Sequence, residues 1–222
     1  MTAPRSALEQ RLGYDFKDTA LLKVALTHAS AGGADYERLE FLGDRVLGLV
    51  VAEILYTLYP HESEGDLSKR HTALVRAETL AALGRTLDIA GSMVLSNAEK
   101  AAGGAENENI LSDIVEAVIG AVFLDGGWDA ARKMLKPMLD DLIVTMGSVP
   151  RDAKTALQEH TQARNLGLPE YTLVSRTGPD HAPEFTVTVR VGTQSATATG
   201  PSKRAAEKSA AALLLDIVEK KK

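Results

Sequence analysis

The chain contains no cysteine, which rules out disulfide bonds and metal sites built on thiolates. Residues 1–16 have no apolar core of the kind that a secretory signal peptide needs. The longest apolar stretch, Val46 to Leu58, is interrupted by Glu53 and is too short to span a bilayer. We therefore expect a cytoplasmic protein without a membrane-spanning segment.

An overall excess of basic residues, which often marks a nucleic-acid-binding protein, is also missing, because the net charge of the 222 residues is −5. The charge is unevenly distributed, however. Residues 151–222 contain eleven Lys and Arg but only eight Asp and Glu, so the acidic excess lies in residues 1–150. Chance alone can produce this asymmetry, but it also fits two domains with different roles, and the length suits two modest domains.

The spacing of apolar residues changes along the chain and predicts two kinds of domain. Recurrence every three or four positions predicts helices over 38–58, 66–90, 110–124 and 128–145, with one short extended piece near Met93–Leu95. After the turn-forming residues 147–150, a helix over 153–165 is expected, then alternating segments at 171–175, 184–190 and 194–199, and a last helix over 202–219. We predict an all-α helical domain over 1–146, a linker over 147–152, and a small α+β domain of order α-β-β-β-α over 153–222.

Three acids gather on one side of the first long helix. At 100° per residue, Glu37, Glu40 and Asp44 fall within about 60° of one another, so they repel each other. The surrounding positions are mostly apolar, which excludes water and strengthens that repulsion. A bound cation would relieve it. Oxygen ligands without His or Cys favour Mg²⁺, or Mn²⁺ in its place.

A second helix shows the same conflict between acids and an apolar setting. Residues 110–124 are almost wholly apolar, as in a buried helix, yet they include Asp113 and Glu116 on one face. Buried carboxylates are rare unless they are paired or bind a metal. Packed face to face, the two helices would form a cage of four carboxylates that suits phosphodiester hydrolysis. The cage acids would be Glu40, Asp44, Asp113 and Glu116.

Simpler structural roles are also open for these acids. Asp113 lies near the expected start of its helix, where a first-turn acid interacts favourably with the helix dipole. Glu37 and Glu40 could pair with Arg38, Arg45 or other cations on a solvated face. Two helices with the same conflict favour the metal-binding interpretation over these alternatives.

At these residues the sequence resembles the ribonuclease III family. The run of residues 37–44, ERLEFLGD, is similar to the signature of that family, and residues 113–120, DIVEAVIG, are similar to its second acidic motif. The C-terminal α-β-β-β-α pattern, including residues 200–207 (GPSKRAAE), resembles a double-stranded-RNA-binding domain. The resemblance covers nearly the whole chain, in the order of the simple bacterial enzymes.

The resemblance implies a function and a set of site residues. It implies a homodimeric, Mg²⁺-dependent endoribonuclease that cuts double-stranded RNA. The products would carry 5′-phosphate and 3′-hydroxyl ends with two-nucleotide 3′ overhangs. The implied roles are ribosomal RNA precursor processing and mRNA turnover. It assigns the metal to the four cage acids, with Glu116 essential, and gives Glu37 and Glu64 auxiliary roles beside the cut. Phe41 corresponds to an aromatic that inserts into the partner subunit, although its type alone also fits the core of one chain.

The C-terminal domain carries residues suited to an RNA duplex. A-form RNA exposes 2′-hydroxyls in a wide minor groove, so a duplex binder needs polar groups for two minor grooves and cations for the phosphates between them. Cations in the first turn of a helix oppose its dipole, and an anion docked there would explain them. A solvated charged face is the simpler alternative for these cations, and an ordinary loop histidine for His181. The candidate contacts are Thr155, Gln158 and Glu159 on the first helix, His181 between the first two strands, and Lys203, Arg204 and Lys208 on the last helix.

Two departures from the family pattern affect these expectations. Arg204 stands where a second lysine is common, which keeps the charge. The loop over 97–109 has Lys100 as its only basic residue, so its RNA contact is in doubt. A binding-only homologue that does not cut RNA is the main alternative function, and a helical phosphohydrolase for small molecules is a weaker one because it leaves the C-terminal domain without a role.

Overall fold

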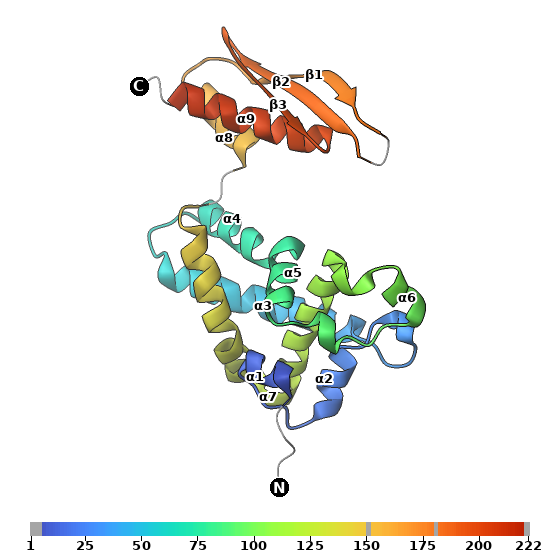
Figure 1. Cartoon of the computed structure of the whole chain (residues 1–222). Coiled ribbons are helices and arrows are strands. Elements are labelled where there is room, and N and C mark those ends of the chain that lie inside the picture. The colour runs from blue at the N-terminus through green and yellow to red at the C-terminus, as the bar shows by residue number, and fades with distance from the viewer. Residues whose placement is uncertain (1–5, 150–151, 180–181, 220–222) are drawn as a thin grey trace. The chain divides into compact units, whose positions relative to one another are not determined.

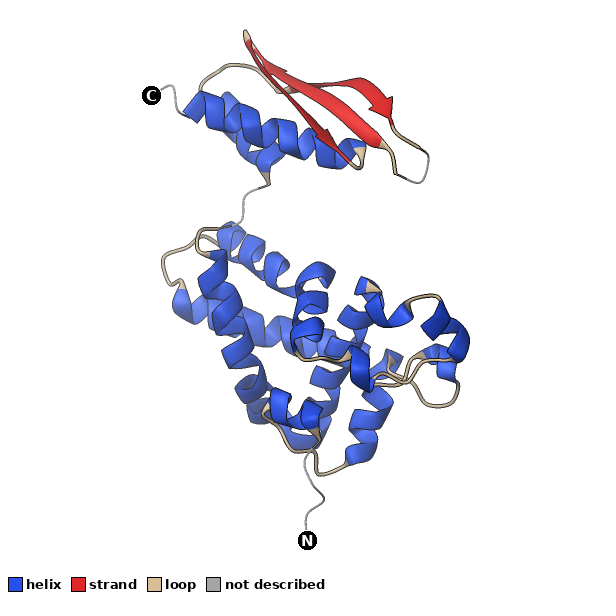
Figure 2. Ribbon diagram, viewed as in Figure 1, coloured by secondary structure: helices blue, strands red, loops and turns tan. Residues whose placement is uncertain are grey.

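The computed structural model describes residues 6–149, 152–179 and 182–219, and the chain divides into two compact units, Met1–Pro150 and Arg151–Lys222 (Figure 1). The first unit is helical and the second combines helices with a sheet (Figure 2), so the predicted fold class is confirmed. The last helix of the first unit ends at Met146 and the first helix of the second begins at Ala153. We keep 147–152 as the proposed linker between proposed domains over 1–146 and 153–222.

The first unit is a bundle of helices of very different lengths. None of the helices in the described part of the chain combines the length and hydrophobicity that crossing a membrane requires. Short 3₁₀ turns lie at Ala29–Ala31, Ala90–Ser92 and Gly104–Glu106. The α-helices are α1 (Ala7–Leu12), α2 (Thr19–Ala25), α3 (Glu37–Leu58), α4 (Glu64–Val75), α5 (Ala77–Thr86), α6 (Asn97–Ala101) and α7 (Glu108–Met146).

Helices α3 and α7 form the centre of this unit and pack along each other. Their inward faces supply fully buried aliphatic side chains, among them Leu47 and Val50 of α3 and Ile114 and Val118 of α7. Helices α2, α4 and α5 pack against this pair. Burial of large apolar side chains contributes roughly 1.5–3 kcal/mol each, so the α3–α7 contact contributes substantially to the stability of the unit.

The long helices depart from the sequence prediction at one internal break. The helix expected over 66–90 is two helices, because Arg76 takes an extended backbone conformation (φ −71°, ψ 152°) between α4 and α5. The break expected between 110–124 and 128–145 is present, because Gly127 (φ 80°, ψ −171°) leaves the helical conformation and divides α7 into two helical halves. The short extended piece is confirmed, since Thr27 and Val94 form a parallel β-bridge.

The second unit is a three-stranded antiparallel sheet packed against two helices. The strands are β1 (Glu170–Thr177), β2 (Glu184–Val191) and β3 (Gln194–Gly200), in the spatial order β1-β2-β3. Helix α9 (Lys203–Glu219) packs on β2 and β3, and α8 (Ala153–Gln162) packs on α9. A small core between these layers includes Leu157, Val189 and Leu214.

Candidate metal centre and RNA-binding surface

Three of the four predicted cage acids meet where α3 and α7 cross. Glu40 comes from the first turn of α3, and Asp113 and Glu116 come from successive turns of α7. Each offers a carboxylate oxygen, and these oxygens all lie within 4.8 Å of one another. All three side chains are half-buried. Such a set of oxygen donors fits a hard divalent cation.

Two glycines allow this crossing to be so close. A Cβ atom on Gly43 of α3 would overlap the backbone carbonyl oxygen of Glu116, and one on Gly120 of α7 would overlap that of Leu39. The two helix backbones therefore touch directly, with no side chain between them. Because Glu40 lies one turn before Gly43, the contact places its carboxylate next to those of α7.

The environment of the cluster favours protonation of its carboxyl groups in the absence of a cation. Burial, followed by the charges of Glu40 and Asp113, raises the pKa of Glu116 to about 7, although nearby Arg45 opposes the shift. Burial also raises the pKa of Glu40, with further contributions from Asp113 and Glu37. The pKa of Asp113 is raised by burial despite opposing effects of Tyr36 and His28. A divalent cation would relieve the repulsion that produces these shifts.

The other predicted acids do not belong to the set of oxygens that lie within 4.8 Å of one another. Asp44 is one turn further along α3 than Glu40, and its carboxylate forms an ion pair with Arg45. Glu37 is exposed at the first position of α3. Glu64 is exposed at the first position of α4, where its Oε1 accepts a hydrogen bond of 3.0 Å from the Ser68 hydroxyl.

The helix-start role considered for Asp113 does not match the structure. Helix α7 begins at Glu108, so Asp113 lies beyond its first turn and has no capping role there. Asn107 caps this helix instead, accepting from the backbone N–H of Asn109 at 2.9 Å. Arg45 pairs with Asp44 rather than with Glu37 or Glu40.

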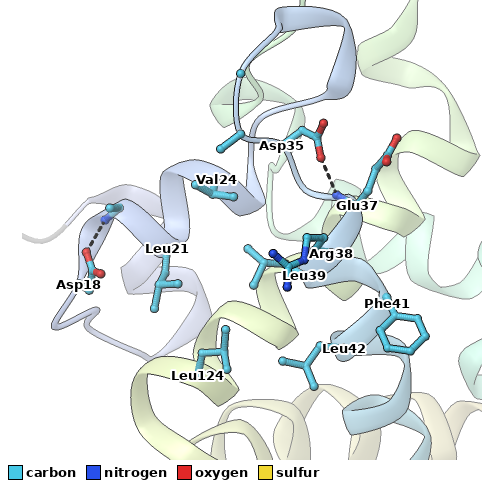
Figure 3. Close-up of a pocket in the computed structure, with 13 residues that line it drawn as sticks. Asp18, Leu21, Val24, Asp35, Glu37, Arg38, Leu39, Phe41, Leu42 and Leu124 are labelled. Carbon is cyan, nitrogen blue, oxygen red and sulfur yellow. Dashed lines mark hydrogen bonds between the residues drawn. The ribbon is translucent and has the colours of Figure 1, made fainter.

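Phe41 is not part of the core of its own chain, since 67% of its surface is exposed. The Arg45 guanidinium lies 5.2 Å from the centre of its ring. Phe41 lines a hollow of about 1130 Å³ (Figure 3), whose apolar lining comes from α2, α3 and α7. The lining includes Leu21, Val24, Leu42 and Leu124.

The predicted RNA contacts in the second unit are exposed on two helices. Thr155, Gln158 and Glu159 lie on α8, and Lys203, Arg204 and Lys208 lie in the first two turns of α9. Ser202 caps α9, because its hydroxyl accepts from the backbone N–H of Ala205 at 3.1 Å. His181 lies outside the described residues.

Sequence reasoning missed one side chain that touches the cluster. The Tyr36 hydroxyl donates a hydrogen bond of 3.4 Å to Oδ2 of Asp113. Tyr36 directly precedes the first acidic motif, but a tyrosine in that place gives no signal of its own. Only the fold shows that it faces α7.

The fold and the site together define a class of protein. The helical unit carries a candidate metal-binding cluster of acids, and the α-β-β-β-α unit that follows has exposed cations at the start of a helix. This combination is the one expected of a nuclease joined to a duplex-binding domain.

Comparison with known proteins identifies the family. Residues 18–142 match the family model described as ribonuclease-III-like, and residues 153–218 match the double-stranded RNA binding motif. The chain is 45% identical over 212 residues to Ribonuclease 3 of Anaplasma phagocytophilum, an alignment that covers 94% of this chain and 90% of the relative. It is 45% identical over 223 residues to Ribonuclease 3 of Cereibacter sphaeroides, covering 99% and 97%.

A solved structure agrees with these sequence matches. The nuclease domain of ribonuclease III from Campylobacter jejuni is 43% identical, with a TM-score of 0.60, and the match covers 61% of this chain and 96% of that domain. The chain therefore belongs to the ribonuclease III family, as an endoribonuclease that carries a double-stranded-RNA-binding domain.

Proposed function

We propose that this protein hydrolyses phosphodiester bonds of double-stranded RNA at the cluster of Glu40, Asp113 and Glu116, with Mg²⁺ as its cofactor and Mn²⁺ able to replace it. The convergence of these three carboxylates from two helices, within 4.8 Å, is the observation that carries the proposal. The absence of nitrogen and sulfur donors from this set favours a hard cation over zinc.

Four side chains of this chain are assigned to the cation. Glu40, Asp113 and Glu116 already face one another, and Asp44, which here pairs with Arg45, would be the fourth ligand. A bound divalent cation lowers the pKa of water and neutralises the charge that develops on the leaving oxygen. The half-buried carboxylates would orient the attacking water, and Glu37 and Glu64 would act as auxiliary acids.

Attack by water determines which ends are produced. The water oxygen becomes part of the phosphate, and the ribose 3′-oxygen leaves and takes up a proton. The products therefore carry 5′-phosphate and 3′-hydroxyl ends. We propose two-nucleotide 3′ overhangs, since two sites related by a dimer axis would each cut one strand.

The proposed homodimer is supported by an exposed apolar stripe on α3. Phe41, Leu49 and Tyr56 are all exposed, and at helical spacing they fall within about 80° of one another. Exposed apolar stripes of this kind favour burial against a partner, and a two-fold axis would place the same stripe on both sides. The Campylobacter jejuni domain is described as having a region involved in dimer formation.

The second unit is proposed to hold the duplex. The side chains of Thr155, Gln158 and Glu159 can exchange hydrogen bonds with 2′-hydroxyls, and Lys203, Arg204 and Lys208 can contact phosphates across the major groove. We retain His181 as a proposed contact in the second minor groove. Processing of ribosomal RNA precursors and turnover of mRNA in the cytoplasm are the proposed roles of the whole protein.

Cleavage by a Glu116→Gln variant tests the assignment of the cluster. The variant removes one charge from the most buried carboxylate, so we expect cleavage of a long duplex in Mg²⁺ to fall at least about 10²-fold. Glu78→Gln, which changes an exposed glutamate of α5, is the control and should cut at the wild-type rate. Unchanged cleavage by Glu116→Gln would refute the site, and duplex binding without cleavage by the wild-type protein would favour the binding-only alternative.

Deletion of residues 150–222 tests the role of the second unit separately. Because phosphate contacts dominate the affinity for nucleic acid, cleavage should fall clearly at physiological salt and recover partly at low salt. An unchanged salt response would contradict the proposed role.

A further inference from the structure

Tyr36 is a buried residue that contacts the acidic cluster without belonging to it. Only 6% of its surface is exposed. Its hydroxyl donates to Oδ2 of Asp113 at 3.4 Å, a contact that joins the residue before α3 to the second turn of α7. One of the two oxygens of Asp113 is therefore engaged by a neighbouring side chain.

The backbone around Tyr36 fixes where its ring lies. Its backbone N–H donates to the carbonyl oxygen of Thr27 at 3.0 Å, and Thr27 forms the β-bridge with Val94. The ring packs against that of His28, with 5.6 Å between the ring centres. The His28 ring is itself held, because its Nδ1 accepts from the backbone N–H of Ser30 at 3.1 Å. The hydroxyl is therefore presented to Asp113 from a rigid support.

The hydroxyl of this buried tyrosine acts as a hydrogen-bond donor to one oxygen of a half-buried carboxylate. A donor fixed to one oxygen of Asp113 restricts rotation of its carboxylate. The other oxygen then stays available to the cation. Partners of this kind typically change metal affinity by about 10- to 100-fold when they are removed.

We propose that Tyr36 is a positioning residue that orients Asp113 for the divalent cation, with His28 as its support. This rests on the proposed function, because it requires a cation at the cluster. Its effect is on the affinity for the cation rather than on the chemical step, so a high concentration of cation should restore the reaction.

Binding of Mn²⁺ alone tests the proposal without RNA. The electron paramagnetic resonance signal of free Mn²⁺ is followed as wild-type protein, Tyr36→Phe and Tyr14→Phe are titrated. Tyr36→Phe keeps the buried ring and removes only the donor. Tyr14→Phe is the matched control, since the Tyr14 hydroxyl donates to another carboxylate, Asp125, at 2.6 Å. We expect the dissociation constant to rise about tenfold or more for Tyr36→Phe only, with cleavage by that variant recovering at high Mg²⁺.

Two outcomes would refute the role of Tyr36 alone, and a third would refute the metal site as well. Wild-type affinity in Tyr36→Phe, or an equal loss in Tyr14→Phe, refutes the positioning role alone. Absence of Mn²⁺ binding that depends on Glu116 in the wild-type protein refutes the metal site and this proposal with it. In an Asp113→Asn background, Tyr36→Phe should cause no further loss of Mn²⁺ affinity. If Tyr36→Phe acted through a general loss of structure, the two losses of affinity would add.

Discussion

Replacing Gly43 with alanine is expected to separate the two helices that carry the acidic cluster. The new Cβ would overlap the Glu116 carbonyl oxygen and lie 3.0 Å from the backbone nitrogen of Gly120. Both obstacles are backbone atoms, which cannot rotate away. Helices α3 and α7 would have to move apart by about 1 Å or more at their crossing, which moves Glu40 away from the carboxylates of α7.

The loss should appear mainly in activity. Overpacking in a core costs typically 1–3 kcal/mol of stability, whereas a displacement of about 1 Å at a catalytic site can reduce the rate about 10²-fold. Cleavage of a long duplex in saturating Mg²⁺ and thermal unfolding of the same preparation measure the two effects separately.

Gly48→Ala is the matched control on the same helix. Its Cβ would lie 3.6 Å from Nε2 of His71, an ordinary contact. Alanine in place of glycine inside a helix stabilises by roughly 0.5–1 kcal/mol, so this variant should be folded, active and slightly more stable. If Gly43→Ala cut RNA as fast as Gly48→Ala, our explanation of how the acids converge would be wrong.

Three further predictions follow from single groups. Because the pKa of Glu116 is raised to about 7 from a usual 4.5, the native state holds more protons than the unfolded chain between these values. Without a divalent cation, the free energy of unfolding should therefore fall as the pH rises through this range, by at most about 3 kcal/mol. Denaturant unfolding measures this fall, which should be smaller with Mg²⁺ present and in the Glu116→Gln variant. Arg70→Met should lower the free energy of unfolding by about 3–5 kcal/mol, because the Arg70 side chain is 4% exposed and pairs with Glu62 at 2.7 Å; an unchanged denaturation midpoint would contradict this. Phe41→Ala should shift the protein from dimer to monomer in sedimentation without unfolding it, and a persistent dimer would show that Phe41 is not an anchor.

Much of the architecture follows from local patterns in the sequence. The three strands were predictable because alternating residues such as those of β2 must present one side to α9 and the other to solvent. The acids of α3 and α7 were recognisable because charged groups in an apolar setting need a partner. Both inferences depend only on the period of a helix or strand and on the cost of burying charge.

The rest depended on contacts between distant segments. The break between α4 and α5 at Arg76 has no glycine or proline to signal it. Periodicity placed Asp44 beside Glu40 but could not show that Arg45 pairs with it. The contact of Tyr36 with α7 spans 77 positions in the sequence, so no local pattern predicts it.

The chemical nature of the cut ends is the most direct test of the central claim, that the half-buried acids and a divalent cation direct water at a phosphodiester in duplex RNA. Purified protein is incubated with a long labelled duplex in Mg²⁺ or in a chelator, and both ends of each fragment are determined. We predict cleavage only with Mg²⁺, giving 5′-phosphate and 3′-hydroxyl ends with two-nucleotide 3′ overhangs. Cleavage in the chelator, or fragments ending in a 2′,3′-cyclic phosphate, would contradict the account, because the attacking oxygen would then be the RNA's own 2′-hydroxyl.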